Sequence, residues 1–164
     1  EIEAVAFPAR EEGKGAIRFN ETAGSMAKDS VFNAASVFRL LTGADISDYD
    51  VHVNVVGGGD IDGPSAGTAI LFALLSAVYG VPIRQDVAVT GELSIQGHVR
   101  EVGGIFEKIY GARQAGIAKV IVPAENTKDV PSDITGIEVI PVSRVEEAIS
   151  HVFDGPLDFV RSRE

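Results

Sequence analysis

The sequence predicts an α+β domain in which small mixed sheets pack against helices. Three observations lead to this prediction. The 164 residues suit one domain, and 45% of them are hydrophobic, which is enough to build a core. Segments with the two-residue period of strands are mixed with segments of helical period. The two kinds do not alternate strictly, as they would in a doubly wound parallel sheet.

Short runs rich in β-branched residues predict the strands. In the clearest run Val51, Val53 and Val55 share one face while His52 and Asn54 share the other, which indicates a half-buried strand. Other apolar runs of strand length cover residues 2–7, 16–19, 86–91, 118–123 and 136–142. Residues 92–104 are expected to form a hairpin that turns at Gln96 and Gly97.

Four segments have the apolar spacing of helices. The first covers about 27–41 and is expected to end at Gly43, and the third covers about 104–115 and ends at Gly116. The last helix is expected to open with a capping box between Ser143 and Glu146.

The second predicted helix, residues 64–79, is apolar nearly all round, which is typical of a buried core helix. Its apolar run is shorter than the roughly 20 residues that a bilayer span needs, so no membrane span is expected here.

Composition excludes several classes of function. A net charge of −10 argues against a nucleic-acid partner and against binding to anionic lipid. The chain has no cysteine, and its three histidines lack metal-ligand spacing, so no metal site is expected. No secretory segment opens the chain, which favours a cytoplasmic location. Because the chain begins without a methionine, we expect it to be part of a larger protein.

A glycine-rich loop, "GGGDIDGPSAG", precedes the apolar helix. Pro64 suits the first helical position, with Gly63 as the N-cap and Ser65 in the first turn. A hydroxyl there lies beside free backbone N–H groups, which can receive an oxyanion or a phosphate. These residues alone leave three roles open for Ser65: a nucleophile, a phosphate-loop hydroxyl or part of an ordinary helix start.

A nucleophilic serine needs a base. Residues 63–67 match the G-x-S-x-G pattern of hydrolases, but only His98 and His151 follow and no acid is singled out, so a histidine-based triad is a weak interpretation. Lys108 is the other candidate base. It lies beside the apolar stripe of the third helix among small residues, where partial burial would favour its neutral amine. On spacing alone, an ordinary surface lysine is the commoner case.

Several motifs in order resemble the proteolytic domain of Lon, the ATP-dependent serine protease with a Ser–Lys dyad. They are "DGPSAG" at 62–67, "VAVTGELSIQGHVREVGGIFEKI" at 87–109 and "GIAKVIVPAEN" at 116–126. Lys108 follows Ser65 by 43 residues, which is the spacing of that family. The similarity covers roughly residues 1–152. It implies the Lon proteolytic-domain fold, which is like domain 2 of ribosomal protein S5.

The resemblance assigns roles residue by residue. Ser65 lies where the family has its nucleophile, and Lys108 where it has the general base. Thr90 corresponds to a threonine that orients the lysine, and Asp62 to an acid linked to opening and closing of the site. Glu3 aligns with a second acid on the first strand. Where many family members have a lysine, this chain has Ile61, which is similar to the bacterial LonB-type or Lon-like branch.

The resemblance also implies a function for the whole protein. It predicts a serine endopeptidase that cleaves unfolded or damaged proteins, with a proteolytic domain at 1–153 and a tail at 154–164. This domain needs no cofactor. ATP and Mg²⁺ are implied only for an AAA+ module of the parent chain, since no P-loop motif is present here. Assembly into a homo-hexamer through the full-length protein is expected.

Two other classes of function compete with the protease. A Lon-like domain can act as a catalytically silent scaffold, although the presence of both Ser65 and Lys108 argues against that role. A glycine-rich loop before a helix also resembles the phosphate loop of the GHMP small-molecule kinases. The acidic net charge does not favour nucleotide binding.

Overall fold

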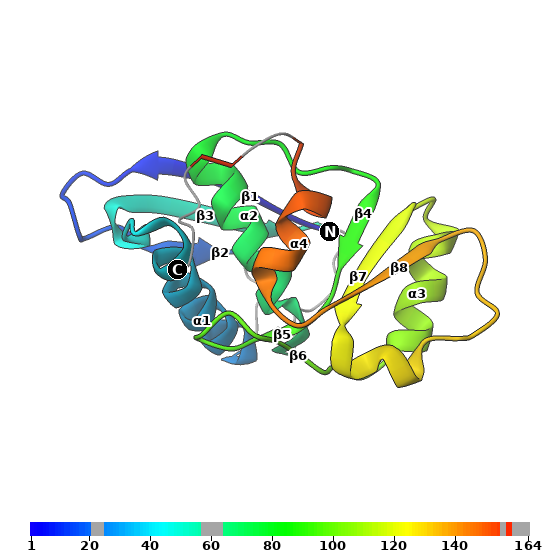
Figure 1. Cartoon of the computed structure of the whole chain (residues 1–164). Helices are drawn as coiled ribbons and strands as arrows, with labels where there is room; N and C mark the ends of the chain where they lie inside the picture. The colour runs from blue at the N-terminus through cyan, green and yellow to red at the C-terminus, as the bar shows by residue number, and fades with distance from the viewer. Residues whose placement is uncertain (21–24, 57–63, 155–156, 159–164) are drawn as a thin grey trace.

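A computed structural model describes residues 1–20, 25–56, 64–154 and 157–158, with the side chains of 25–27 left out. Its first layer is a sheet of three strands in the order β1-β3-β2 (Figure 1). β1 (Ile2–Pro8) runs antiparallel to β3 (Tyr49–Val55), and β2 (Ile17–Phe19) runs parallel to β3. The predicted alternation is confirmed, because Val51, Val53 and Val55 are buried while His52 is exposed.

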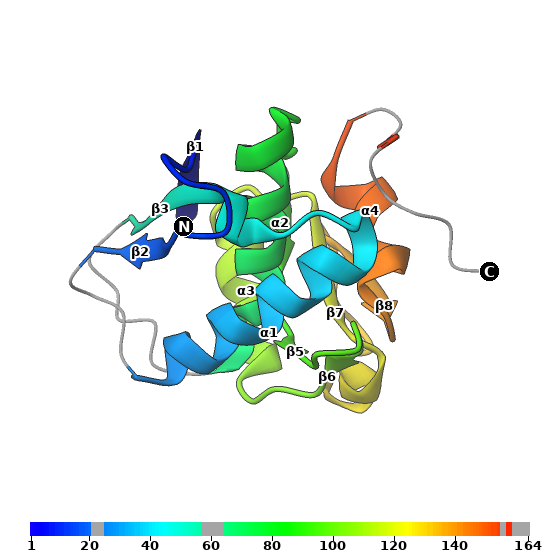
Figure 2. The ribbon, with the colours of Figure 1, turned by 90° about the vertical axis from the view of Figure 1, so that its left-hand side faces the viewer.

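Two helices cover one face of this sheet. α2 (Gly67–Tyr79) contacts β1 and β3, and α1 (Ser25–Thr42) crosses over α2 (Figure 2). Eight of the nine positions 67–75 of α2 are buried, which explains why apolar residues occupy every side of this part of the helix. The core helix expected from the sequence is therefore confirmed. In the part of the chain that the structure describes, no helix has the length and apolarity to cross a bilayer.

A second sheet lies beside the first layer (Figure 1). Its three parallel strands, β4 (Val87–Val89), β7 (Lys119–Pro123) and β8 (Glu138–Val142), have the order β4-β7-β8. α3 (Ile105–Gln114) covers its outer face. α4 (Val145–Val152) follows β8 on the side of α2.

The middle strand of the second sheet is shared by two cores. Ile121 belongs to the large core of α1, α2 and α4, while Val120 and Val122 pack against Ile105 and Ile109 of α3. This division follows from the alternation of side chains along a strand. The predicted α+β class, with small mixed sheets packed against helices, is confirmed.

The connections are short. β5 (Glu92–Leu93) and β6 (Val99–Arg100) form the predicted hairpin, in which Gly97 has a positive φ of 87°. Three 3₁₀ turns complete the described chain: η1 (Ile46–Asp48), η2 (Pro64–Ala66) and η3 (Ala124–Asp129). The division into a domain at 1–153 and a tail stays a prediction, although Leu157 packs against the large core.

Two expected helix starts are wrong by a few residues. α2 begins at Gly67 rather than Pro64, because the first-turn groups bond outside the helix: the carbonyl of Ser65 accepts the N–H of Gly91 at 3.2 Å, and the N–H of Thr68 reaches the carbonyl of Gly91 at 3.4 Å. The segment 64–66 is left as a tight 3₁₀ turn. The expected N-cap Gly63 lies outside the described residues.

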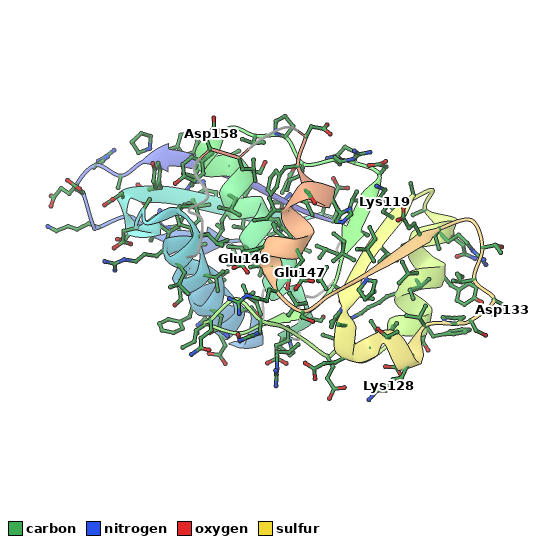
Figure 3. All side chains as sticks on the ribbon, viewed as in Figure 1. Lys119, Lys128, Asp133, Glu146, Glu147 and Asp158 are labelled. Carbon is green, nitrogen blue, oxygen red and sulfur yellow. The ribbon has the colours of Figure 1, made fainter. Side chains whose placement is uncertain are left out.

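The capping box of the last helix is also displaced. The carbonyl of Ser143 accepts the N–H of Val99 at 2.9 Å, which ties Ser143 to the hairpin and moves the helix start on by one residue. Arg144 is the N-cap, and Glu147 accepts its N–H at 3.1 Å. Glu146 instead forms an ion pair with the Arg144 guanidinium at 2.9 Å. Figure 3 labels both carboxylates at the start of α4.

One buried side chain braces the chain just before α3. Asn126 is 1% exposed and meets both backbone groups of Val102. Its Oδ1 accepts the Val102 N–H at 2.9 Å, and its Nδ2 donates to the Val102 carbonyl at 2.9 Å and to Asp129 at 2.9 Å. The side-chain amide therefore provides hydrogen-bond partners for the backbone groups of Val102, which no strand pairing provides.

The substitution Asn126→Ala should lower the free energy of unfolding by about 1–3 kcal/mol, because it leaves the backbone groups of Val102 without partners. Denaturant unfolding followed by circular dichroism measures the change. Glu125→Ala is the matched control, since that carboxylate is 45% exposed and pairs with Arg100 at 3.6 Å. The control should stay within about 0.5 kcal/mol of the parent. Equal losses in the two variants would contradict the bracing role.

Candidate active site

Ser65 lies in the 3₁₀ turn directly before α2. The rigid, buried helix behind it gives the turn a fixed base. Its side chain is half-buried, and its carbonyl accepts the N–H of Gly91 at 3.2 Å. A backbone hydrogen bond therefore joins the serine turn to a segment that follows β4.

Thr90 and Gly91 form the turn between β4 and β5. The Thr90 N–H donates to the carbonyl of Ile121 at 3.0 Å, which continues the pairing of β4 with β7. Thr90 itself is buried, with 7% of its surface exposed. Gly91 cannot carry a side chain here, because a Cβ would lie 2.4 Å from Cγ1 of Val99. The turn is packed closely on every side that the structure describes.

Lys108 extends from α3 to the same turn. Its Nζ donates to Oγ1 of Thr90 at 3.2 Å. Ile105 and Ile109 anchor α3 on the second sheet, and this orientation leaves Lys108 half-buried. Burial lowers the pKa of the Lys108 amine below its usual range, because a charged ammonium loses hydration there. A lysine whose pKa is lowered in this way is more readily present as the neutral amine, which is the form that accepts a proton.

Two segments of the candidate site, the turn that contains Ser65 and the helix that contains Lys108, both contact the Thr90–Gly91 turn. Ser65 bonds to Gly91 through its carbonyl, and Lys108 bonds to Thr90 through its amine. Because Thr90 and Gly91 are adjacent in the chain, the backbone of Ser65 and the amine of Lys108 contact neighbouring residues of one turn. A hydroxyl group and an amine whose pKa is lowered are the two groups that a serine–lysine acyl transfer uses.

The remaining predicted site residues have different outcomes. Asp62 lies outside the described residues. Glu3 is exposed on β1, where its Oε1 accepts from Nδ2 of Asn54 at 2.8 Å. It lines an open depression of about 480 Å³ on the uncovered face of the first sheet, together with His52 and Arg18. No described contact brings Glu3 to the turn at Thr90.

The two histidines that a triad would require lie elsewhere. His98 belongs to the β5–β6 turn, where its N–H donates to Oγ of Ser94 at 3.0 Å, and His151 lies in the last turn of α4. Neither ring has a hydrogen bond to Ser65 in the described ranges. Among the same residues, no three His, Cys, Asp or Glu side chains gather as metal ligands.

Sequence reasoning missed two residues that hold the site together. Gly91 is required by the close approach of Val99, and Thr68 donates its hydroxyl to the Gly91 carbonyl at 2.9 Å. No periodicity or spacing distinguishes them, since both contacts join segments far apart in the sequence. The available signal is a threonine within the mostly apolar, buried start of a helix.

Known proteins are similar to this chain along almost its whole length. The family of the Lon protease (S16) C-terminal proteolytic domain matches residues 1–155. Lon protease 2 of Bacillus subtilis is 45% identical over 80% of the chain and 24% of its own length. The archaeal Lon protease of Archaeoglobus fulgidus is 40% identical over 93% of the chain and 25% of its own length. The Lon protease of Rickettsia bellii is 38% identical over 92% of the chain and 20% of its own length.

The fold and the relatives define the class of the molecule as a protease domain. The chain belongs to the Lon protease (S16) C-terminal proteolytic domain family, as its motifs predict. It spans about a quarter of the length of the two relatives from Bacillus and Archaeoglobus.

The lowered pKa of Lys108 makes a prediction about stability. The unfolded chain holds this proton up to its ordinary pKa of 10.5, whereas the folded chain releases it at lower pH. The unfolded state therefore binds more protons between the two values, so stability rises with pH through that window. Lys108→Met should remove this rise in the free energy of unfolding. The substitution should stabilise the protein most at pH values below the folded-state pKa of Lys108, because the parent protein then holds a charged ammonium in a partly buried position.

Urea unfolding of the parent and of Lys108→Met at several pH values up to 10.5 measures the difference. Lys128→Met is the control, because that side chain is 70% exposed. A difference between the parent and Lys108→Met that does not change with pH would contradict a desolvated amine.

Proposed function

We propose that this chain is a serine endopeptidase in which Ser65 is the nucleophile and Lys108 is the general base. One observation carries the proposal: the Thr90–Gly91 turn is bonded both to the serine turn and to the lysine amine. The lowered pKa of Lys108 supports it, because a general base must be partly neutral at the working pH. The order and spacing of the Lon-like motifs support the same pair.

In the acylation step, the neutral Lys108 amine takes the proton of the Ser65 hydroxyl as its oxygen attacks a peptide carbonyl. The negative charge on the carbonyl oxygen is stabilised by backbone N–H groups at the start of α2, on the positive side of the helix dipole. Thr90 accepts a hydrogen bond from the amine and holds it in place. The lysine then gives its proton to the leaving amine, and the peptide bond breaks.

In the deacylation step, Lys108 takes a proton from water as the water oxygen attacks the ester on Ser65. The ester C–O bond then breaks, the lysine gives that proton to the Ser65 oxygen, and the second product leaves as a carboxylic acid. Every proton in this sequence moves between the serine, the lysine, water and the peptide. The chemistry therefore needs no metal or nucleotide in this domain. Asp62 and Glu3 are proposed to influence access to the site rather than to transfer protons.

The proposed substrates are unfolded or damaged polypeptides. An AAA+ module in the parent chain would use ATP and Mg²⁺ to deliver them, and a hexameric ring of the full-length protein would enclose the sites. We propose a cytoplasmic location, with which the absence of cysteine agrees. Neither nucleic acid nor a membrane is proposed as a partner, in keeping with the net charge of −10.

The scaffold and kinase alternatives have less support. A silent scaffold has no need of a half-buried lysine held against a threonine hydroxyl, since burying an amine costs stability. The match to a protease family over residues 1–155 disfavours a small-molecule kinase.

Ser65→Ala and Lys108→Ala should each abolish hydrolysis of an unstructured protein such as fluorescein-labelled casein. The first variant removes the nucleophile and the second removes the base, so each should leave turnover at the background rate. Fluorescence release over hours measures the loss.

Two variants with the same chemical changes are the controls. Ser36→Ala removes a hydroxyl that bonds within α1, and Lys128→Ala removes an exposed amine (Figure 3). Both should keep the parent rate. Appreciable turnover by Ser65→Ala or Lys108→Ala would rule out the dyad.

The dependence of kcat on pH should follow the protonation state of Lys108. Activity should rise as Lys108 loses its proton and should reach a plateau below pH 10.5, because burial lowers its pKa. Turnover of a fluorogenic peptide across this range gives the profile, while circular dichroism at each pH confirms that the chain stays folded. A rate that still increases through pH 10.5 would mean that no desolvated lysine acts as the base.

A further inference from the structure

Thr68 directs a buried hydroxyl at the Thr90–Gly91 turn, which contacts both Ser65 and Lys108. It lies in the first turn of α2 and is 0% exposed. Its Oγ1 donates to the carbonyl of Gly91 at 2.9 Å, and its own N–H reaches the same oxygen at 3.4 Å. The short bond to Gly91 is therefore made by the side chain.

This contact differs from the one that a threonine in the body of a helix can make. There the hydroxyl can bond to a carbonyl in the preceding turn of the same helix, whereas Thr68 in the first turn has no preceding turn of α2. Thr42 in α1 makes such a bond, with its Oγ1 donating to the carbonyl of Phe38 at 2.8 Å. Thr68 bonds instead to a residue 23 positions along the chain. A valine would fill the same buried space without a polar atom, so packing alone does not require a hydroxyl here.

We propose that Thr68 is a positioning residue, whose hydroxyl holds the Gly91 peptide so that Ser65 and Lys108 stay in register. Gly91 bonds to Ser65 through its N–H and to Thr68 through its carbonyl, so the turn is clamped on both sides. Thr90, next in the chain, carries the contact with Lys108. A shift of the Gly91 backbone would be transmitted through the Thr90–Gly91 peptide bond to Thr90, whose Oγ1 the lysine amine contacts.

Loss of the hydroxyl should affect the chemical step more than substrate binding. The Gly91 carbonyl would keep only the long contact with the Thr68 N–H, and the Thr90–Lys108 distance would vary more. Small displacements of a base from its partner reduce the rate of proton transfer. The effect on turnover rests on the proposed function, whereas the clamp itself can be tested without it.

The test compares Thr68→Val with Thr68→Ser in the same 164-residue chain. Thr68→Val should lower kcat for a fluorogenic peptide about five- to tenfold, the loss of roughly one hydrogen bond, and leave KM within about twofold. Thr68→Ser keeps the hydroxyl and should retain most of the parent kcat. Thr42→Val is the matched control, because it removes a hydroxyl–carbonyl bond of the same kind from α1. Its kcat should not change.

Amide hydrogen exchange measured by NMR tests directly whether the Thr68 hydroxyl holds the Gly91 backbone in place. The Gly91 N–H should exchange about fivefold faster in Thr68→Val than in the parent, Thr68→Ser or Thr42→Val, because its bond to Ser65 opens more often. If Thr68→Val does not fold, Thr68→Ala makes the same deletion with less crowding at the Gly91 oxygen.

Three results would overturn the proposal. Unchanged exchange at Gly91 in the folded deletion variants would show that there is no clamp. Faster exchange with the parent kcat would show a contact that does not serve the reaction. Equal losses of kcat in Thr68→Ser and Thr68→Val would assign the effect to altered side-chain packing, because only Thr68→Val removes the hydroxyl. If the parent chain itself has no turnover, the proposed function fails, while the exchange experiment still supports or overturns the clamp.

Discussion

The peptide that contains Gly91 is the point on which the site depends. Its N–H bonds to Ser65, its carbonyl bonds to Thr68, and the preceding residue bonds to Ile121 and to Lys108. These contacts come from α2 and its preceding turn, from β7 and from α3. A single turn therefore joins the large core around α2 to the smaller core under α3. The absence of a side chain at Gly91 is what allows the segments to approach so closely.

The two cores serve the site in different ways. The large core surrounds α2 with apolar contacts, which keep the turn at Ser65 on a rigid support. The smaller core anchors α3 through Ile105 and Ile109, so that Lys108 is half-buried and its amine contacts Thr90. Partial burial of that amine costs stability, and the apolar contacts of both cores offset the cost. The lowered pKa is the chemical gain from the same burial.

Local patterns predicted most of the secondary structure, because period and turn residues act over a few positions. The alternation in 51–55, the apolar helix after residue 64 and the hairpin at Gly97 were all found where expected. The errors arose where long-range bonds compete with local ones. The start of α2 bonds to Gly91, and Ser143 bonds to Val99, so both helices begin later than their sequence signals predict.

The sequence by itself determined the fold class, the elements and the family, since motifs in order along the chain carry that information. It also named Ser65 and Lys108 as candidates from their positions, although only the resemblance favoured a catalytic role over an ordinary helix start and a surface lysine. The resemblance implied that Thr90 orients the lysine, and the structure gives the contact in which Thr90 accepts from Lys108. The tertiary structure alone decided that Gly91 bonds to Ser65 and that Thr68 donates to Gly91. These contacts depend on the packing of two sheets against α2 and α3, and no local pattern encodes the distance between segments that meet only after the cores form.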